Sequence, residues 1–348
     1  MQKVDYILSG QGIAGTLLAF HLKNAGKKIA VFDPATPNAS SVSAGIINPI
    51  TGRKFVKSWM IDTFLSQAII DYQALEKMLN ISILQSQSLF RTFSNPEEEN
   101  DWLSRSADPK YFPFIRQYPQ INPIHLTLQT PLGYGEVNHA FKVKVPELLT
   151  AFRNQLLLAK EFFEEKLDHR QLIFEPNKII YQNLIADKII FCEGAAHIHN
   201  PFFNPSLIIP NKGQLFIVHI PKATIDRIVK QSIFFVPLGN DRYWVGSTNE
   251  RQFDTDKPTP EGYDFLQQKL KSLLKIPFLI EQHLSGLRAT VKDRRPILGI
   301  HPENPAIAIF NGMGTKGASL APYWAKILTQ HLIDQSPIPN EVKLQRFF

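Results

Sequence analysis

The sequence predicts an α/β protein in which a doubly wound, mostly parallel sheet accompanies a mostly antiparallel sheet with helices. Three observations carry this prediction. A short apolar run at residues 4–8 leads into a glycine-rich turn and a helical pattern, and a second glycine-rich turn, at residues 311–317, does the same. Between them, residues 213–248 alternate as strands, with hairpin residues at 239–241.

The composition bounds the class of protein. The chain has 348 residues, 44% of them hydrophobic and 20% charged, which excludes disorder and suggests about two domains. Cys192 is the single cysteine, so an internal disulfide and a cysteine-rich metal site are excluded. The net charge of +7 favours anionic ligands or nucleic acid without choosing between them. No signal peptide and no run of about 18 apolar residues occur, so we expect a cytoplasmic protein without a membrane partner.

The first glycine turn has the order of a dinucleotide-binding unit. Residues 10–15 read GQGIAG, the following helix runs to Gly26, and a second strand at 29–32 ends at Asp33. In such a unit Gly10 permits the tight turn, Gly12 lets a pyrophosphate approach the backbone, and Gly15 lets helix and strand pack closely. Asp33 would accept hydrogen bonds from a ribose. A purely structural glycine turn is the alternative.

The middle of the chain supplies the remaining elements. A small, turn-rich loop at 40–51 precedes a helix at 61–79 whose apolar stripe belongs to the core. The later expected elements are a loose strand at 81–94, an irregular segment at 108–123, a helix at 145–166, strands at 172–174, 178–181 and 188–192, antiparallel strands at 213–220, 232–237 and 242–248, a helix at 260–274, a strand at 306–310 and a helix at 318–333.

Two features that could suggest other chemistry are set aside. Cys192 ends an apolar strand without a histidine or acid at catalytic spacing, so we interpret it as a buried strand residue. His197 and His199 form a pair with no further ligand cluster in the sequence, so no metal site is predicted.

Taken together, the motifs resemble the D-amino-acid oxidase and glycine oxidase superfamily of FAD-dependent oxidoreductases. The resemblance rests on GQGIAG with Asp33, IIFCEGA, NKGQL, FFVPLGNDRYWVGSTNE, SGLRATVKDRRPILG and NGMGTKGASLAP, in that order. It implies an FAD-binding, doubly wound Rossmann-like domain at residues 1–58, 135–205 and 285–348. It also implies a mostly antiparallel β-sheet substrate domain with helices at residues 59–134 and 206–284.

The resemblance further implies a noncovalent FAD cofactor, because no cysteine suited to linking a flavin is evident. It places the cofactor against backbone and side chains of three segments. These are Gly10, Gly12, Ile13, Ala14, Gly15 and Asp33, then Ala44, Gly45, Ile46 and Gly194, and finally Gly312, Met313, Gly314, Thr315, Lys316 and Gly317.

By the same resemblance, the reaction is oxidation of a C–N bond in a carboxylate-bearing amine, with hydride passing to flavin N5. Arg288 is expected to hold the carboxylate, because its planar guanidinium fork suits that group, and Lys316 is expected near the flavin. A structural ion pair at Arg288 and a solvated Lys316 are the alternatives. Phe235 is expected beside the substrate; amino-acid oxidases carry a tyrosine where this chain has Phe234-Phe235.

Two other functions stay open. The segments GLRATVKDRRPILG and NGMGTKGASLAP and the chain's last residues, LQRFF, also resemble the FAD domain of a bifunctional enzyme that removes a carboxymethyl group from a modified wobble uridine, which would make tRNA the partner. An FAD-binding protein without an amine substrate is the third hypothesis. The sequence leaves the particular amine, the electron acceptor and the oligomeric state open.

Overall fold

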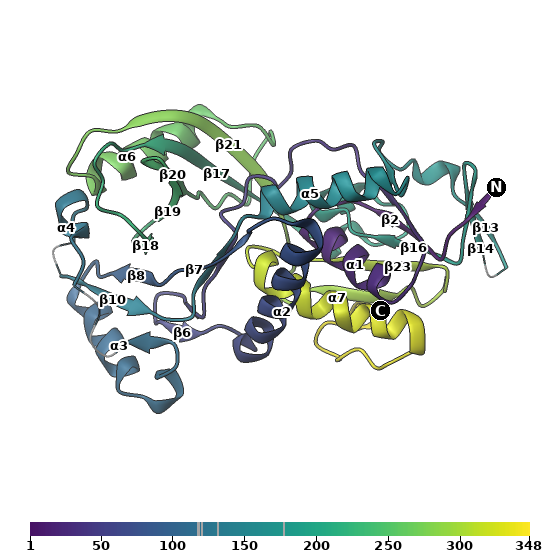
Figure 1. The fold of residues 1–348 in the computed structure, drawn as a ribbon, viewed down its shortest axis with the longest axis horizontal. Helices are drawn as coiled ribbons and strands as arrows, with labels where there is room; N and C mark the ends of the chain where they lie inside the picture. Colours follow the sequence, from purple (N-terminus) through teal and green to yellow (C-terminus); the bar gives the residue numbers. More distant parts are fainter. Residues whose placement is uncertain (117–118, 120, 131, 177) are drawn as a thin grey trace.

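Two large sheets lie side by side in the computed structural model, which describes residues 1–116, 119, 121–130, 132–176 and 178–348 (Figure 1). Both chain termini lie on the side of the smaller sheet. That sheet has six strands and the other has eight. No helix in the described part of the chain is long and apolar enough to cross a membrane.

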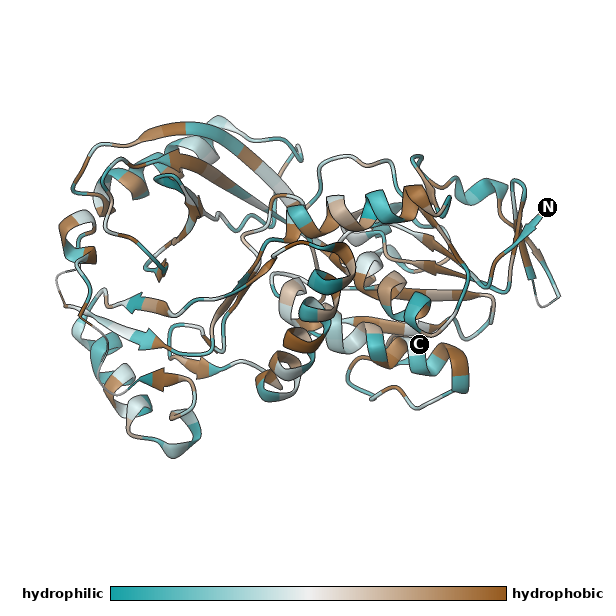
Figure 2. Cartoon of the chain, in the orientation of Figure 1, coloured by the Kyte–Doolittle hydropathy of each residue, from teal (hydrophilic) through white to brown (hydrophobic). Residues whose placement is uncertain are grey.

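The six-stranded sheet is mostly parallel. Its order is β12 (Phe162–Phe163), β3 (Ile29–Phe32), β2 (Tyr6–Ser9), β16 (Lys188–Phe191), β23 (Ile307–Asn311) and β22 (Ile297–Ile300), and only β22 runs antiparallel to its neighbour. Strands β2, β3 and β16 are almost wholly buried, as expected for a sheet covered on both faces. The central strands of this sheet are mostly hydrophobic, which Figure 2 shows in brown. Helix α1 (Ile13–Asn24) packs against both α5 (Val145–Leu158) and α7 (Gly317–Asp334).

The eight-stranded sheet is mostly antiparallel. Its order is β21 (Leu279–Thr290), β17 (Ile209–His219), β20 (Arg242–Gly246), β19 (Phe234–Gly239), β18 (Ile228–Lys230), β8 (Leu89–Thr92), β10 (Tyr134–Val137) and β9 (Ile115–Arg116). One face packs on α6 (Pro260–Leu273) through a core that includes Phe216, Phe235 and Leu266. The opposite face is therefore free to line a site.

Smaller elements connect and flank these sheets. Helix α2 (Ile61–Leu79) packs against α7, while α3 (Pro96–Ser106) and α4 (Ile124–Thr127) lie at the other end of the molecule (Figure 1). The remaining strands are β1 (Gln2–Lys3), β13 (Ile173–Glu175), β14 (Lys178–Tyr181) and β15 (Leu184–Ala186) in one sheet, β4 (Ile46–Ile47), β7 (Leu84–Ser86) and β11 (Phe141–Val143) in another, and the pair β5 (Ile50–Thr51) and β6 (Val56–Lys57).

The predicted fold class is confirmed, and so is the hairpin between β19 and β20. Asn240 and Asp241 both have positive φ, 51° and 54°, as a tight hairpin turn of the primed type requires. The helix predicted at 145–166 is too long: it ends at Leu158, and β12 follows. The strand predicted at 81–94 is two strands, β7 and β8, which belong to different sheets.

Other differences concern the second half of the eight-stranded sheet and its flank. Helix α3 was not predicted; it begins at Pro96 behind the cap Asn95, whose side chain accepts the amide of Glu98. The segment at 108–123 contains a short helical turn and β9, with residues 117, 118 and 120 outside the described part. The domain boundaries expected before residues 135 and 285 fall inside β10 and β21.

Candidate functional site

A cavity of about 1310 Å³ lies where the two sheets meet, and both contribute to its lining. From the six-stranded sheet come the residues that follow β2, β3, β16 and β23, at the carboxyl ends of parallel strands. In α/β proteins this edge is where ligands bind, because the turns there are free of the sheet's own hydrogen bonds. The free face of the eight-stranded sheet forms the opposite wall.

The first glycine turn brings the start of α1 to the cavity. Gly10, Gly12, Ile13 and Ala14 line it, whereas Gly15 does not. A Cβ atom at Gly15 would lie 1.9 Å from the carbonyl oxygen of Gly10, so this glycine lets helix and turn pack together. The close-packing function expected for Gly15 is thus confirmed, without contact to the cavity.

Asp33 stands at the end of β3 and is almost fully buried, with 7% of its surface exposed. Its carboxylate accepts the backbone amide of Gln11 at 2.7 Å and that of Ala35 at 2.8 Å. Arg153, on α5, lies 3.8 Å away. Asp33 therefore holds the glycine turn in place while it lines the cavity.

Glu193, which sequence reasoning quoted in a motif but did not single out, follows β16 and also lines the cavity. Its carboxylate accepts hydrogen bonds from Ser9 at 2.7 Å and Asn200 at 2.9 Å, and it pairs with His169 at 2.8 Å. Burial would raise the pKa of Glu193, but these hydrogen bonds outweigh burial and lower the pKa below its usual value. Glu193 is thus an ionised group at the cavity wall.

The second glycine loop brings the start of α7 to the same cavity. Met313, Gly314, Thr315, Lys316 and Gly317 all line it, and Gly312 lies just outside. Gly12, which precedes α1, has no side chain with which to cap that helix, and the side chain of Lys316, which precedes α7, does not cap it. Two helix N-termini, with their positive dipole ends, thus face one cavity.

Lys316 is itself half-buried, and its ammonium donates to the hydroxyl of Ser58 at 3.2 Å. Burial lowers the pKa of Lys316, and the positive charges of Arg295 and Arg294 lower it further. The Lys316 side chain is therefore partly buried rather than freely solvated, and its role beside the flavin stays a prediction.

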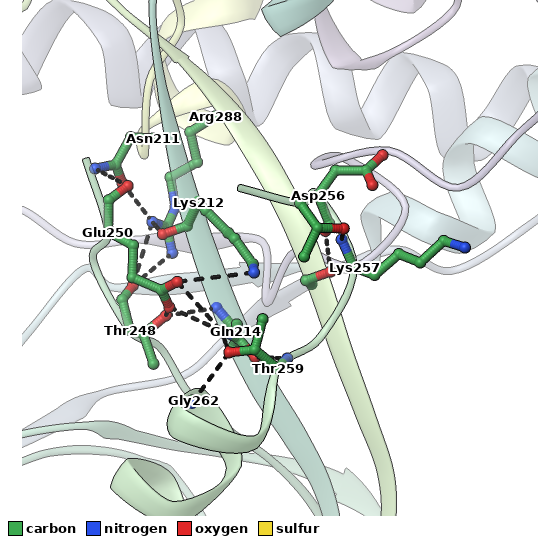
Figure 3. Close-up of polar contacts among 12 residues, drawn as sticks. Asn211, Lys212, Gln214, Thr248, Glu250, Asp256, Lys257, Thr259, Gly262 and Arg288 are labelled. Carbon is green, nitrogen blue, oxygen red and sulfur yellow. Dashed lines mark hydrogen bonds and ion pairs between the residues drawn. The ribbon is translucent and has the colours of Figure 1, made fainter. Parts of the chain in front are cut away.

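Arg288, on β21, lines the cavity and has only uncharged hydrogen-bond acceptors (Figure 3). Its guanidinium donates to the side chains of Asn211 at 2.8 Å and Ser247 at 2.5 Å, and to the carbonyl of Thr248 at 3.3 Å. In the described part of the chain no Asp or Glu forms an ion pair with it. Burial lowers the pKa of Arg288, and the nearby Glu250 carboxylate partly offsets this.

Glycine at position 213 makes room for this guanidinium. A Cβ atom there would lie 1.9 Å from a terminal nitrogen of Arg288, so the side chain crosses directly over the β17 backbone. The NKGQL motif therefore has a structural reason that only the paired strands reveal.

Most of the residues predicted for the site come together. The cavity is lined by Gly10, Gly12, Ile13, Ala14, Asp33, Ala44, Gly45, Ile46, Gly194, Arg288, Met313, Gly314, Thr315, Lys316 and Gly317. The expectation that Phe235 lies beside the substrate is wrong. Phe235 is fully buried in the core beneath α6, and Phe234 lines the cavity instead. The reason is the alternation of side chains along β19, which sends neighbours to opposite faces of the sheet.

Other lining residues were not named from the sequence. Ser40 accepts the amide of Ile13 at 3.1 Å, and Trp244 donates to the carbonyl of Val42 at 2.9 Å, so the loop after β3 is fixed against both sheets. Among the residues that the structure describes, no group of three or more His, Cys, Asp or Glu could hold a metal ion.

The two helix N-termini, the glycine turn and Asp33 fit a dinucleotide, whose phosphates need backbone N–H donors and whose ribose needs an acceptor. A family model described as "FAD dependent oxidoreductase" matches residues 5–331. The chain therefore belongs to this family, and its cofactor is FAD. It is an oxidoreductase of the amino-acid oxidase type.

Relatives of known name agree with this assignment. The chain is 23% identical to a glycine oxidase of Bacillus licheniformis, over 98% of this chain and 95% of that protein. It is 22% identical to the tRNA 5-methylaminomethyl-2-thiouridine biosynthesis bifunctional protein MnmC of Idiomarina loihiensis, over 94% of this chain but 55% of that protein. The solved glycine oxidase of Bacillus cereus has the same fold, with a TM-score of 0.80, 17% identity and 96% of each chain covered.

Proposed function

We propose that this protein oxidises the C–N bond of a carboxylate-bearing amine and that Arg288 holds the substrate carboxylate. The observation that carries the proposal is the set of partners around Arg288. The guanidinium of Arg288 is half-buried on the cavity wall, and its hydrogen-bond acceptors are uncharged. Its positive charge is therefore not neutralised within the protein and can attract an anion that enters the cavity. A carboxylate matches its fork in geometry and in charge.

The remaining roles follow from the same cavity. FAD, when bound, supplies a hydride acceptor at its N5 atom. The N–H groups at the start of α1 hold the pyrophosphate, and Asp33 accepts from a ribose hydroxyl. Lys316 and the start of α7 would stabilise negative charge on the bound flavin. Arg288 positions the substrate, and no general base is required when the amine arrives unprotonated.

The domains are part of this proposal. Residues 1–58, 135–205 and 285–348 form the FAD domain, and residues 59–134 and 206–284 form the substrate domain, with β10 and β21 crossing between them. FAD is held without a covalent bond, since Cys192 lies at the end of a buried strand and burial raises the pKa of its thiol, which leaves it unreactive.

The direct test mixes the purified protein, without oxygen, with glycine, sarcosine, iminodiacetate, D-amino acids, an amine without a carboxylate and undermodified tRNA, each separately, and follows the flavin absorbance. At least one of these amines should bleach the flavin, and readmitted oxygen or an added electron acceptor should restore it. Bleaching by neutral amines but by no amine with a carboxylate would contradict the role of Arg288. If neither the amines nor tRNA bleaches the flavin, the result would favour an FAD-binding protein without an amine substrate.

A second candidate is an oxidase that acts on a glycine-like amine borne by tRNA. The similarity to the MnmC protein over 94% of this chain and the net charge of +7 favour it. Phe234 lies on the cavity wall where amino-acid oxidases carry a tyrosine, so the site lacks one hydroxyl that would form a hydrogen bond with a free amino acid. Undermodified tRNA should then bleach the flavin, and its binding should weaken steeply with salt. Salt-independent binding would count against this candidate.

A further inference from the structure

Two positively charged side chains lie side by side on the eight-stranded sheet. Arg91 on β8 and Lys230 on β18 are directly paired residues of adjacent parallel strands, and both line the cavity. Like charges at directly opposite positions destabilise a sheet, so this arrangement has a cost that burial increases.

The protein supplies less negative charge than these two cations require. Arg91 donates to Glu98 at 3.1 Å and to the carbonyl of Gln231 at 2.8 Å, while its Nε is buried with no hydrogen-bond partner. Lys230 donates to the carbonyl of Ser232 at 2.8 Å, and no carboxylate of the described residues forms an ion pair with it. Glu98 is therefore the carboxylate that pairs with Arg91, none of the described residues supplies one to Lys230, and Glu98 also accepts the amide of Ser94.

The electrostatics of the pair agree with these contacts. Burial, together with the positive charge of Arg91 and against the opposing effect of Glu98, lowers the pKa of Lys230 to about 8. Burial also lowers the pKa of Arg91. Cationic side chains whose pKa values are lowered by burial and by a neighbouring like charge, on the wall of a cavity, are typical of ligand-binding positions.

The same sheet face connects this pair to Arg288. Successive strands contribute Arg288, Leu215, Trp244, Phe234, Lys230 and Arg91 to one cavity. Strands lie about 4.8 Å apart, so β21 and β18 are separated by roughly 19 Å measured along the curved sheet. The wall is thus cationic at both ends and apolar and aromatic between them.

From this wall we propose that Arg91 and Lys230 form a second anion site, which binds an anionic group that the substrate carries beyond its reacting amine. The proposal rests on the proposed function, with Arg288 as the site for the first carboxylate. The substrate class is an extended amine with an anion at each end and a flat or apolar middle. The distal anion is a carboxylate or a phosphate.

The test measures binding without turnover. Carboxymethyl ethers, in which oxygen replaces the amine nitrogen, offer the first carboxylate but no C–N bond to oxidise. Each carries a tail, about four to twelve methylene groups long, that ends in a carboxylate, a phosphonate or a neutral amide. Calorimetry on the FAD-loaded protein should give an anionic tail of suitable length at least tenfold tighter binding than the amide tail of the same length, the scale of one charge-assisted hydrogen bond. A phosphonate preference indicates a nucleotide phosphate as the source, and a carboxylate preference indicates a small diacid.

Variants locate the effect. Lys230→Met should remove most of the preference for the anionic tail and Lys230→Arg should retain it, while Lys326→Met is the matched control, because Lys326 on α7 contacts Gln67 and does not line the cavity. Lys230→Met should also raise the midpoint of thermal unfolding without ligand, since it removes a like-charge pair. Should Lys230→Met fail to fold, Lys230→Gln gives the same comparison.

Equal binding of anionic and neutral tails by the parent at every length, or an unchanged preference in the folded Lys230→Met or Lys230→Gln variant, would overturn the second anion site. The proposed reaction is judged separately, by whether the matching amines bleach the flavin. If the protein prefers the anionic tail but none of the matching amines bleaches the flavin, the second anion site is supported and the proposed amine oxidation is contradicted.

Discussion

Lys212 and Glu250 form an ion pair beside Arg288: the fully buried ammonium of Lys212 lies 3.8 Å from the Glu250 carboxylate (Figure 3). Glu250 also accepts hydrogen bonds from Gln214 at 3.0 Å and from Thr248. The Glu250 carboxylate, whose charge acts on Arg288, is therefore occupied by other partners. This arrangement keeps Arg288 without an internal counter-ion.

Replacing Lys212 with methionine should destabilise the protein by roughly 3 kcal/mol, because it leaves the Glu250 carboxylate without its cation. Chemical unfolding of the FAD-loaded protein measures the change. The double variant Lys212→Met/Glu250→Gln should recover part of the loss, since it removes the orphaned charge. If the double variant loses the sum of the two single effects, the two residues are not coupled.

Arg288→Lys should leave FAD bound but slow bleaching of the flavin by a carboxylate-bearing amine at least tenfold, because lysine keeps the charge and loses the fork. Stopped-flow absorbance under anaerobic conditions measures this rate. Arg242→Lys is the matched control: Arg242 is an exposed residue of β20 paired with Glu281. Bleaching of Arg288→Lys at the parent rate would show that another group, with Lys316 or Arg53 as candidates, holds the carboxylate.

The purified protein should be yellow, release FAD on acid or heat treatment, and lose FAD binding on Gly12→Val. A branched side chain at Gly12 would fill the space between the backbone and the pyrophosphate. Flavin absorbance after gel filtration measures retention, with Ala107→Val, at the exposed end of α3, as the control. Full FAD content in Gly12→Val would place the phosphates elsewhere.

Asp33→Ala should weaken FAD binding by roughly 1–3 kcal/mol, the scale of a charge-assisted hydrogen bond. Loss of the bonds to the Gln11 and Ala35 amides should loosen the turn as well. Titration of FAD into the apoprotein measures the affinity. Asp5→Ala is the control, since Asp5 likewise accepts a backbone amide, that of Lys28, away from the cavity. An equal loss in both variants would mean that Asp33 acts only through stability.

Glu193 should make stability depend on pH in the acid range. Its folded pKa lies below the ordinary value of 4.5, so its stabilising effect is complete above pH 4.5 and is lost as the pH falls through the folded pKa. At pH 7, Glu193→Gln should cost roughly 1–3 kcal/mol in the free energy of unfolding. Denaturant titrations of parent and variant should converge as the pH falls below that value. A difference independent of pH would contradict the assignment.

Local chemistry let the sequence predict the α/β class, both glycine turns and the hairpin at Asn240-Asp241. Each depends on residues a few positions apart, such as Gly10, Gly12 and Gly15, whose lack of a side chain has a direct local use. Site residues were missed where the local sequence fits several roles equally well. Glu193 after a buried strand is one, since nothing local shows that Ser9, His169 and Asn200 meet it.

The face toward which a side chain points was beyond the sequence at β19. Phe234 and Phe235 are chemically identical neighbours, and only the pairing of β19 with β18 and β20 decides that Phe234 faces the cavity and Phe235 the core. The helix expected to run to 166 shows the same limit. It ends at Leu158 because the chain turns there to pair Phe162 with Val31 in the parallel sheet.

The sequence by itself determined the dinucleotide-binding turn, the acid at position 33 and the second glycine loop, because close approach and turn geometry are encoded in neighbouring residues. The tertiary structure alone decided which cations share a wall. Arg91, Lys230 and Arg288 are far apart along the chain, and the register of β8, β18 and β21 brings them to one face. Strand pairing across such separations is fixed by the burial of whole sheets, and no local pattern encodes it.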